Sequence, residues 1–257
     1  MSIPKILHYC WFGGKPKPPL AEKCIRSWRK FCPDFEIREW NESNFDLEQV
    51  PAYVRQAYEA GRWAFVTDYV RLRALTEVGG VYLDTDVEVV RPLDPFLKHE
   101  AFAGFESPTY VQTAVLGCRK AFPLFQEFLT YYDSAVFWKE DGTENVTTNV
   151  EILTNLCLSH GLQTNGLFQV LDGLAVYPCE FFCPIAYETR KMHKTRNTAA
   201  IHWFSESWHT EEELKEMRTE RIRKRKEWIK IFRYRVGKVI FGEQGYEKLK
   251  AVMKKKK

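Results

Sequence analysis

Two aspartates separated by one residue, Asp84 and Asp86, directly follow the short apolar segment 81–83. An apolar run of this length between glycines and acids is typical of a buried strand. Because residues two apart on a strand share a face, we expect both carboxylates to point into one crevice at the end of that strand. Carboxylates are costly in such a place unless a cation meets them. We therefore predict a site for Mn²⁺ or Mg²⁺, which bind carboxylates together with the phosphates of a substrate.

A second pair of charged residues, Asp68 and Arg71, precedes the acids by one helix and one turn. The segment 64–78 has apolar residues on enough sides to predict a helix that is packed on both sides. Gly79 and Gly80 are expected to end that helix, since glycine tolerates the backbone angles of a helix end. Residues three apart share a helix face, so Asp68 and Arg71 should face the same pocket beside the metal site.

The elements around this stretch predict an α/β fold. Residues 3–11 and 35–40 have the pattern of strands, and the intervening segment 20–31 has helical spacing. A strand, a helix and a strand in that order imply a parallel sheet. Further elements are expected as strands at 87–90, 102–105, 111–116, 168–171, 175–177 and 199–204, and as helices at 122–136, 146–158 and 211–236.

Charge divides the chain of 257 residues into two parts. Residues 1–210 hold 21 Lys and Arg against 26 Asp and Glu, whereas residues 211–257 hold 17 against 8, so an acidic body precedes a basic extension. We expect a catalytic domain at 1–210 and a basic helical extension at 211–257. The seven scattered cysteines, the lack of a membrane-length apolar run and the lack of a signal-peptide pattern suggest a cytoplasmic protein with reduced thiols.

Three blocks of the sequence resemble one known family. They are IPKILHYCWFG near the start, TDYVRLRALTEVGGVYLDTDVEVVRPLD in the middle and AIHWFSESW near the end. They are similar to DXD-containing sugar transferases, most of all to the bacterial branch of glycosyltransferase family 32, and more distantly to the glucosylating clostridial toxins. The resemblance implies a fold of the GT-A type, a nucleotide-sugar donor, a divalent metal ion and transfer with retention of anomeric configuration. It also suggests a capsule, lipopolysaccharide or lipid-linked glycan as acceptor.

The resemblance carries roles to individual residues. Asp84, Asp86 and His202 match metal ligands, and Asp68 and Arg71 match the residues that hold the sugar and phosphates of the donor. The donor site should further include Trp11, which would stack near the base, Tyr82 of the strand, and a closing segment with Ser207 and Trp208. Catalysis is expected to depend on Asp68, Arg71 and Asp86, with no protein base, since the leaving phosphate can take the proton of the acceptor. We expect UDP in preference to GDP as the nucleotide.

Two departures from the family pattern concern the donor sugar and the acceptor. Members often have Asn near position 113, where this chain has Gln112 and Thr113. They also often have a Thr-Gly-Pro turn before the following helix, where this chain has Thr147, Thr148, Asn149 and Val150.

Other hypotheses stay open at this point. The acid pair also resembles the DxD nucleophile of haloacid-dehalogenase-type phosphatases, although some eighty residues of strand and helix precede it here. A third hypothesis is a non-catalytic, sugar-nucleotide-binding protein at a membrane surface. Trp11 fits a core aromatic as well as a base-stacking residue. The basic extension fits a helix that lies on an anionic membrane surface, peripheral on the inner face of the cell membrane, as well as a solvated helix packed on the body. We expect no nucleic-acid binding, because the basic residues are not part of a recognised nucleic-acid-binding module.

Overall fold

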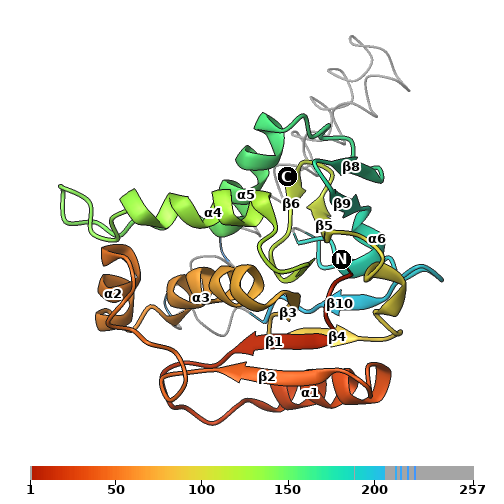
Figure 1. The fold of residues 1–257 in the computed structure, drawn as a ribbon, viewed down its shortest axis with the longest axis horizontal. Coiled ribbons are helices and arrows are strands. Elements are labelled where there is room, and N and C mark those ends of the chain that lie inside the picture. Colours follow the sequence, from red (N-terminus) through yellow and green to blue (C-terminus); the bar gives the residue numbers. More distant parts are fainter. Residues whose placement is uncertain are drawn as a thin grey trace, which may run out of the picture. The chain divides into compact units, whose positions relative to one another are not determined.

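The first three strands of the sheet run parallel and bring their carboxyl ends to one edge. Strand β1 (Ile6–Cys10) pairs in parallel with β2 (Glu36–Trp40) on one side and with β3 (Gly80–Leu83) on the other. Helix α1 (Pro19–Phe31) connects β1 to β2, as the sequence pattern predicted. The end of β3 and the end of β1 therefore lie side by side, and the loops that follow them form one rim (Figure 1).

Beyond β3 the sheet is mixed, so the expectation of a parallel sheet holds for β2, β1 and β3 and, further on, for the pair β5 and β9. The strand order is β2-β1-β3-β7-β5-β9-β8, and a short strand β6 also pairs with β5. Strand β7 runs antiparallel to both neighbours, β3 and β5. A separate two-stranded sheet joins β4 and β10. The bounds of these strands are β4 Val87–Val89, β5 Ala101–Ser107, β6 Tyr110–Val111, β7 Val115–Cys118, β8 Gln169–Leu171, β9 Leu174–Tyr177 and β10 Ala200–His202.

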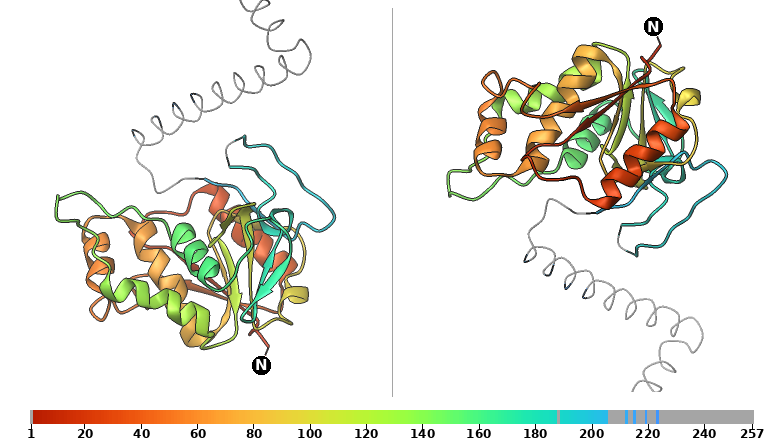
Figure 2. Two further views of the ribbon diagram at one scale, coloured as in Figure 1. Left: turned by 90° about the horizontal axis from the view of Figure 1, so that it is seen from above. Right: turned by 90° about the horizontal axis from the view of Figure 1, so that it is seen from below.

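Helices cover both faces of the sheet. One apolar cluster unites the sheet with α2, α3, α4 and α5, and a second cluster unites it with α1, α6 and β4. Seen from below, α1 lies across the strands from α3 (Figure 2). These helices are α2 Ala52–Glu59, α3 Trp63–Val78, α4 Pro123–Ser134, α5 Asn149–Ser159 and α6 Cys179–Phe182, and a 3₁₀ turn spans Asp94–Phe96.

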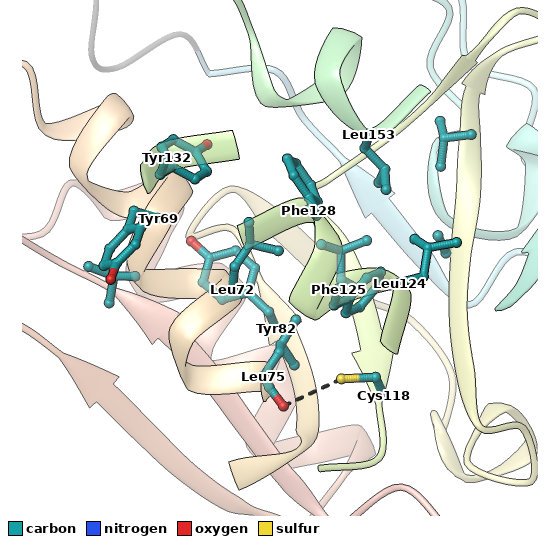
Figure 3. Packing of buried hydrophobic residues seen from close by; sticks show 14 of the residues in the cluster. Tyr69, Leu72, Leu75, Tyr82, Cys118, Leu124, Phe125, Phe128, Tyr132 and Leu153 are labelled. Carbon is teal, nitrogen blue, oxygen red and sulfur yellow. Dashed lines mark hydrogen bonds between the residues drawn. The ribbon is translucent and has the colours of Figure 1, made fainter. Parts of the chain in front are cut away.

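Helix α3 is enclosed between the sheet and α4, which confirms that it packs on both sides. Tyr82 of β3 lies beneath it, and Phe125 and Phe128 of α4 lie against it (Figure 3). The thiol of Cys118 on β7 donates to the carbonyl of Leu75 at 3.5 Å. Because almost no side of α3 faces water, polar residues on this helix must find partners inside the protein.

The double glycine after α3 lets the chain turn directly into β3. Gly79 has φ +77, and a Cβ there would lie 2.6 Å from the backbone nitrogen of Lys120; at Gly80 a Cβ would lie 2.7 Å from the carbonyl oxygen of Ile6. The Nε2 of His8, a fully buried residue of β1, lies 2.8 Å from the carbonyl oxygen of Gly79. A side chain at Gly80 would push β1 and β3 apart, and one at Gly79 would collide with the backbone that follows β7, so close packing requires glycine at both positions.

The computed structural model describes residues 2–187 and 189–205, together with residues 212, 215, 219 and 223. The predicted helix at 211–236, the boundary between a domain at 1–210 and an extension at 211–257, and the membrane hypothesis lie outside these residues and stay predictions. Within the described part of the chain, no helix is both long enough and apolar enough to span a bilayer.

Candidate metal and donor site

The side chains of Asp84, Asp86 and His202 converge at the rim where β3 ends. Each offers a ligand atom, and these atoms all lie within 4.8 Å of one another. The two acids do not lie on a strand, as the sequence had suggested, but on the turn between β3 and β4. His202 ends β10 and lies opposite Val87 of β4, so the small antiparallel sheet brings a residue from the far end of the chain to the acids.

Backbone hydrogen bonds fix both aspartates in place. The backbone N–H of Asp84 donates to the carbonyl oxygen of Ala114 at 2.9 Å, which ties the turn to the segment before β7. The carbonyl oxygen of Asp86 accepts from the N–H of Trp203 at 3.0 Å, and its carboxylate Oδ2 accepts from the N–H of Ser205 at 2.7 Å. The geometry of the acid pair therefore depends on two distant segments, and each supplies only main-chain groups.

Burial and charge act in opposite directions on Asp86 and His202. Their side chains are 14% and 12% exposed, and Asp86 Oδ1 lies 3.5 Å from His202 Nε2. Burial alone would raise the pKa of Asp86, but the His202 ring and the Ser205 N–H bring it below its ordinary value. Burial would likewise lower the pKa of His202, and the neighbouring Asp86 raises it well above its ordinary value. The pair is a strongly polarised acid–imidazole couple in a mostly buried place.

Arg71 links this cluster to α3. Its guanidinium lies 2.9 Å from Asp68 Oδ1 and 3.3 Å from Asp84 Oδ1. Its Nη1 donates to the carbonyl oxygen of Thr113 at 2.9 Å. The ring of Tyr82 lies 4.6 Å from the centre of the guanidinium, and its hydroxyl donates to Asp84 Oδ1 at 3.0 Å. The predicted Asp68–Arg71 pair is thus real and buried, and it reaches Asp84.

Asp68 has a second partner that the sequence did not reveal. Asn149, the first residue of α5, donates from Nδ2 to Asp68 Oδ1 at 2.6 Å, and its Oδ1 accepts from the Thr113 hydroxyl at 2.8 Å. Burial raises the pKa of Asp68 to about 7, while Arg71 and the Asn149 hydrogen bond act to lower it. Thr113 and Asn149, which belong to the two departures from the family pattern, are therefore in direct contact with each other and with the candidate site.

Other predicted site residues are less tightly connected. Trp11 follows β1 at the same rim, is half-buried, and donates from its indole N–H to the carbonyl oxygen of Lys15 at 2.6 Å. No hydrogen bond or ion pair joins Trp11 to the acids within the described residues. Ser207 and Trp208 lie outside the described residues, so their predicted roles stay untested. Cys183 of the segment after α6 was not predicted; its thiol lies beside the His202 ring.

The structure is a mixed α/β fold whose rim carries carboxylates, an imidazole and a guanidinium, and comparisons with known proteins show what this arrangement is similar to. Residues 18–103 match the family model described as "Glycosyltransferase sugar-binding region containing DXD motif". That interval contains Asp68, Arg71, Asp84 and Asp86. Over this interval the chain is similar to DXD-containing glycosyltransferases, as the sequence resemblance predicted.

Individual relatives are more distant. Inositol phosphoceramide mannosyltransferase 3 of Schizosaccharomyces pombe is 32% identical over 130 residues, which cover 48% of this chain and 35% of that protein. An uncharacterised glycosyltransferase of Acanthamoeba polyphaga mimivirus is 25% identical over 203 residues, covering 71% of this chain and 77% of that protein. The solved structure titled "PaToxG Glycosyltransferase" has a TM-score of 0.50 at 18% identity, covering 62% of this chain and 69% of that chain. The match thus spans about a third of the yeast relative's length, and the likeness to PaToxG shows the mixed, GT-A-like α/β fold alone.

Proposed function

We propose that this protein is a glycosyltransferase that moves a hexose from a nucleoside diphosphate to a glycan or lipid-linked glycan acceptor, with retention of configuration and with a divalent cation. The observation that carries the proposal is the convergence of Asp84, Asp86 and His202 within 4.8 Å, beside the buried Arg71. Main-chain hydrogen bonds, from the Asp84 N–H to Ala114 and from the Trp203 N–H to Asp86, hold the turn that carries the two acids. The site is built for a ligand that combines a cation with negatively charged oxygens.

The residues present fit a divalent metal ion. Two carboxylates and one imidazole form a donor set that suits Mn²⁺ or Mg²⁺. The Nδ1 of His202 is buried and has no hydrogen-bond partner within the described part of the chain. The other ring nitrogen, Nε2, lies 3.5 Å from Asp86 Oδ1, and this placement beside the carboxylates supports a role for it in ligand binding. When bound, such an ion would neutralise negative charge on the diphosphate that leaves the sugar.

The chain's own residues would act around that diphosphate. Arg71 is fixed by Asp68, Asp84 and the carbonyl of Thr113, so its charge is available at a constant place and needs no reorganisation during the reaction. The second oxygen of Asp68, Oδ2, accepts no hydrogen bond from the described residues and is free to accept from sugar hydroxyls. Trp11, at the end of the adjacent strand, is placed to contact the base. No residue is assigned as a general base, since a phosphate oxygen can accept the acceptor's proton.

The donor and acceptor are proposed more narrowly than the family defines them. We propose UDP in preference to GDP as the nucleotide. A relative whose printed name is a mannosyltransferase acting on inositol phosphoceramide supports an acceptor that carries a lipid. The excess of Lys and Arg in residues 211–257 would favour an anionic membrane surface near such an acceptor.

The test is a binding and turnover assay of the full chain with Mn²⁺ and a set of UDP- and GDP-sugars. A ligand that binds only the folded protein raises its free energy of unfolding by about 2.7 kcal/mol at 100 times its dissociation constant. We expect such stabilisation, and slow hydrolysis of the donor, for the wild type and for Asp133→Asn, a control on the exposed side of α4. Asp86→Asn should lose both. A protein that binds no nucleotide in the presence of Mn²⁺, or that becomes phosphorylated on Asp84, would contradict the proposal.

A further inference from the structure

The first residue of α5 is inserted into the candidate site, although it stands 81 positions from its partner along the chain. Asn149 is 6% exposed, and Asp68 is 8% exposed. Its amide nitrogen donates to Asp68 Oδ1 at 2.6 Å. The same Oδ1 lies 2.9 Å from the Arg71 guanidinium, so it already has two partners, and Oδ2 is the oxygen that can bind a ligand.

The orientation of the Asn149 amide is determined from both sides. The Arg71 guanidinium, 2.9 Å from Asp68 Oδ1, favours the ionised carboxylate, which can only accept hydrogen bonds. The amide nitrogen therefore faces Asp68, and the amide oxygen faces away from it. The oxygen then accepts from the hydroxyl of Thr113 at 2.8 Å, and Thr113 is 3% exposed. The Thr113 carbonyl in turn accepts from Arg71. Asp68, Asn149, Thr113 and Arg71 therefore form a closed ring of contacts.

The backbone that carries Asn149 is held independently of this ring. Thr148 caps α5, its side chain accepting from the backbone N–H of Glu151 at 3.3 Å. Thr154, five residues after Asn149 on the same helix, accepts from the backbone N–H of Val111 at 2.9 Å. The helix is thereby fixed to β6, so the position of the Asn149 side chain does not depend on a ligand.

We propose that Asn149, oriented by Thr113, is a positioning residue that holds Asp68 Oδ2 toward the sugar of the donor, and that this pair determines how strongly the site prefers a sugar nucleotide to the bare nucleotide. The proposal rests on the proposed function, and it assigns roles to two residues outside the predicted acid and arginine set. Arg71 and the acid cluster contact the diphosphate with or without Asn149. The sugar alone depends on the orientation of Asp68.

The experiment compares dissociation constants of the full chain for UDP, GDP, UDP-glucose, UDP-galactose, UDP-N-acetylglucosamine and GDP-mannose, each with Mn²⁺. In Asn149→Ala we expect the affinity for the preferred sugar nucleotide to fall about 10-fold or more, and that for its bare nucleotide to change less than about 2-fold. Thr113→Val should show the same pattern more weakly, and Thr113→Ser, which keeps the hydroxyl, should resemble wild type. Thr76→Val is the matched control: it removes a buried hydroxyl that donates only to backbone carbonyls of its own helix, α3, and it should lower stability without changing the ratio of the two affinities.

The outcomes separate this proposal from the function on which it rests. If the wild type binds none of the six ligands, the proposed function fails and this proposal fails with it. If the wild type binds them but Asn149→Ala weakens nucleotide and sugar nucleotide equally, or weakens neither, only the positioning role is overturned. Should Asn149→Ala not fold, the comparison of Thr113→Val with Thr113→Ser decides, since equal affinity ratios in those two variants would refute the role.

Discussion

Replacing Arg71 with methionine removes a positive charge that lies between Asp68 on α3 and Asp84 on the β3–β4 turn. The guanidinium side chain is 5% exposed and contacts Asp68, Asp84 and the Thr113 carbonyl. The side chain of Asp84 is 27% exposed and can bind water in place of Arg71. The side chain of Asp68 is only 12% exposed and cannot. The cost of the substitution therefore falls mainly on Asp68.

The magnitude follows from leaving a buried carboxylate without its counter-charge. Removing one partner of a buried ion pair typically costs about 3–5 kcal/mol. The Asn149 hydrogen bond remains and moderates the loss, while the Thr113 carbonyl loses a donor. We expect the free energy of unfolding to fall by about 4 kcal/mol, a large part of the 5–15 kcal/mol typical of a whole domain. With a urea slope of about 2 kcal/mol per molar, the unfolding midpoint should move down by about 2 M.

The assay is equilibrium urea unfolding, followed by circular dichroism at about pH 9, where Asp68, whose pKa is raised by burial to about 7, is ionised in the wild type. The double variant Asp68→Asn/Arg71→Met removes both charges, and it should be more stable than Arg71→Met by about 2 kcal/mol. The reasoning is refuted if Arg71→Met loses less than about 1 kcal/mol, or if the double variant is no more stable than the single one. Neither measurement depends on any activity of the protein.

Three further outcomes follow from other parts of the structure. Asp86→Asn should abolish Mn²⁺-dependent stabilisation by nucleotides in a thermal-shift assay while leaving the fold intact, and retained stabilisation would show that the carboxylate is not a ligand. His160 lies between Asp172 and Glu127, and its pKa is raised, chiefly through its hydrogen bond to Asp172. Its contribution to stability is therefore complete below its unfolded pKa of about 6.5 and is lost as the pH rises through its folded pKa. Wild type should accordingly exceed His160→Gln in urea-unfolding stability at about pH 5.5 and match it at about pH 9, and a difference that grows with pH would contradict this assignment. Gly117→Ala would place a Cβ within 2.7 Å of three atoms of the buried Phe102 ring, and it should lower the free energy of unfolding by about 1–3 kcal/mol. The double variant Gly117→Ala/Phe102→Leu should recover part of this loss. An unchanged melting temperature in Gly117→Ala would show that the ring can move aside.

Local patterns predicted the part of the fold around α3 well, because neighbouring residues decide it. The apolar positions of the helix, the double glycine and the short strand β3 all follow from the sequence of one stretch. The strand directions beyond β3 do not, since they depend on which strands pair. Residues 111–116 were expected as one strand, but the chain pairs with β5 at Val111 and with β3 from Val115, so the segment between them is irregular. Helix α5 begins at Asn149 and not at 146, because Thr148 caps it.

The site divides in the same way. Asp68, Arg71, Asp84 and Asp86 lie within nineteen residues and could be identified from spacing and residue type. His202 required the resemblance to a family, since its approach depends on the pairing of β10 with β4. In the sequence, Asn149 stands out only as part of a departure from the family pattern, which does not reveal its partner. Its role becomes visible only where the fold joins positions 68 and 149.

The segment between β6 and β7 holds the charged residues through its peptide groups. The carbonyl of residue 113 accepts from Arg71, and that of residue 114 accepts from the N–H of Asp84. Every amino acid has a carbonyl, so substitutions at these two positions leave both tethers intact. Natural variants can therefore alter which substrate is selected here, through the side chains, while inheriting an unchanged electrostatic framework.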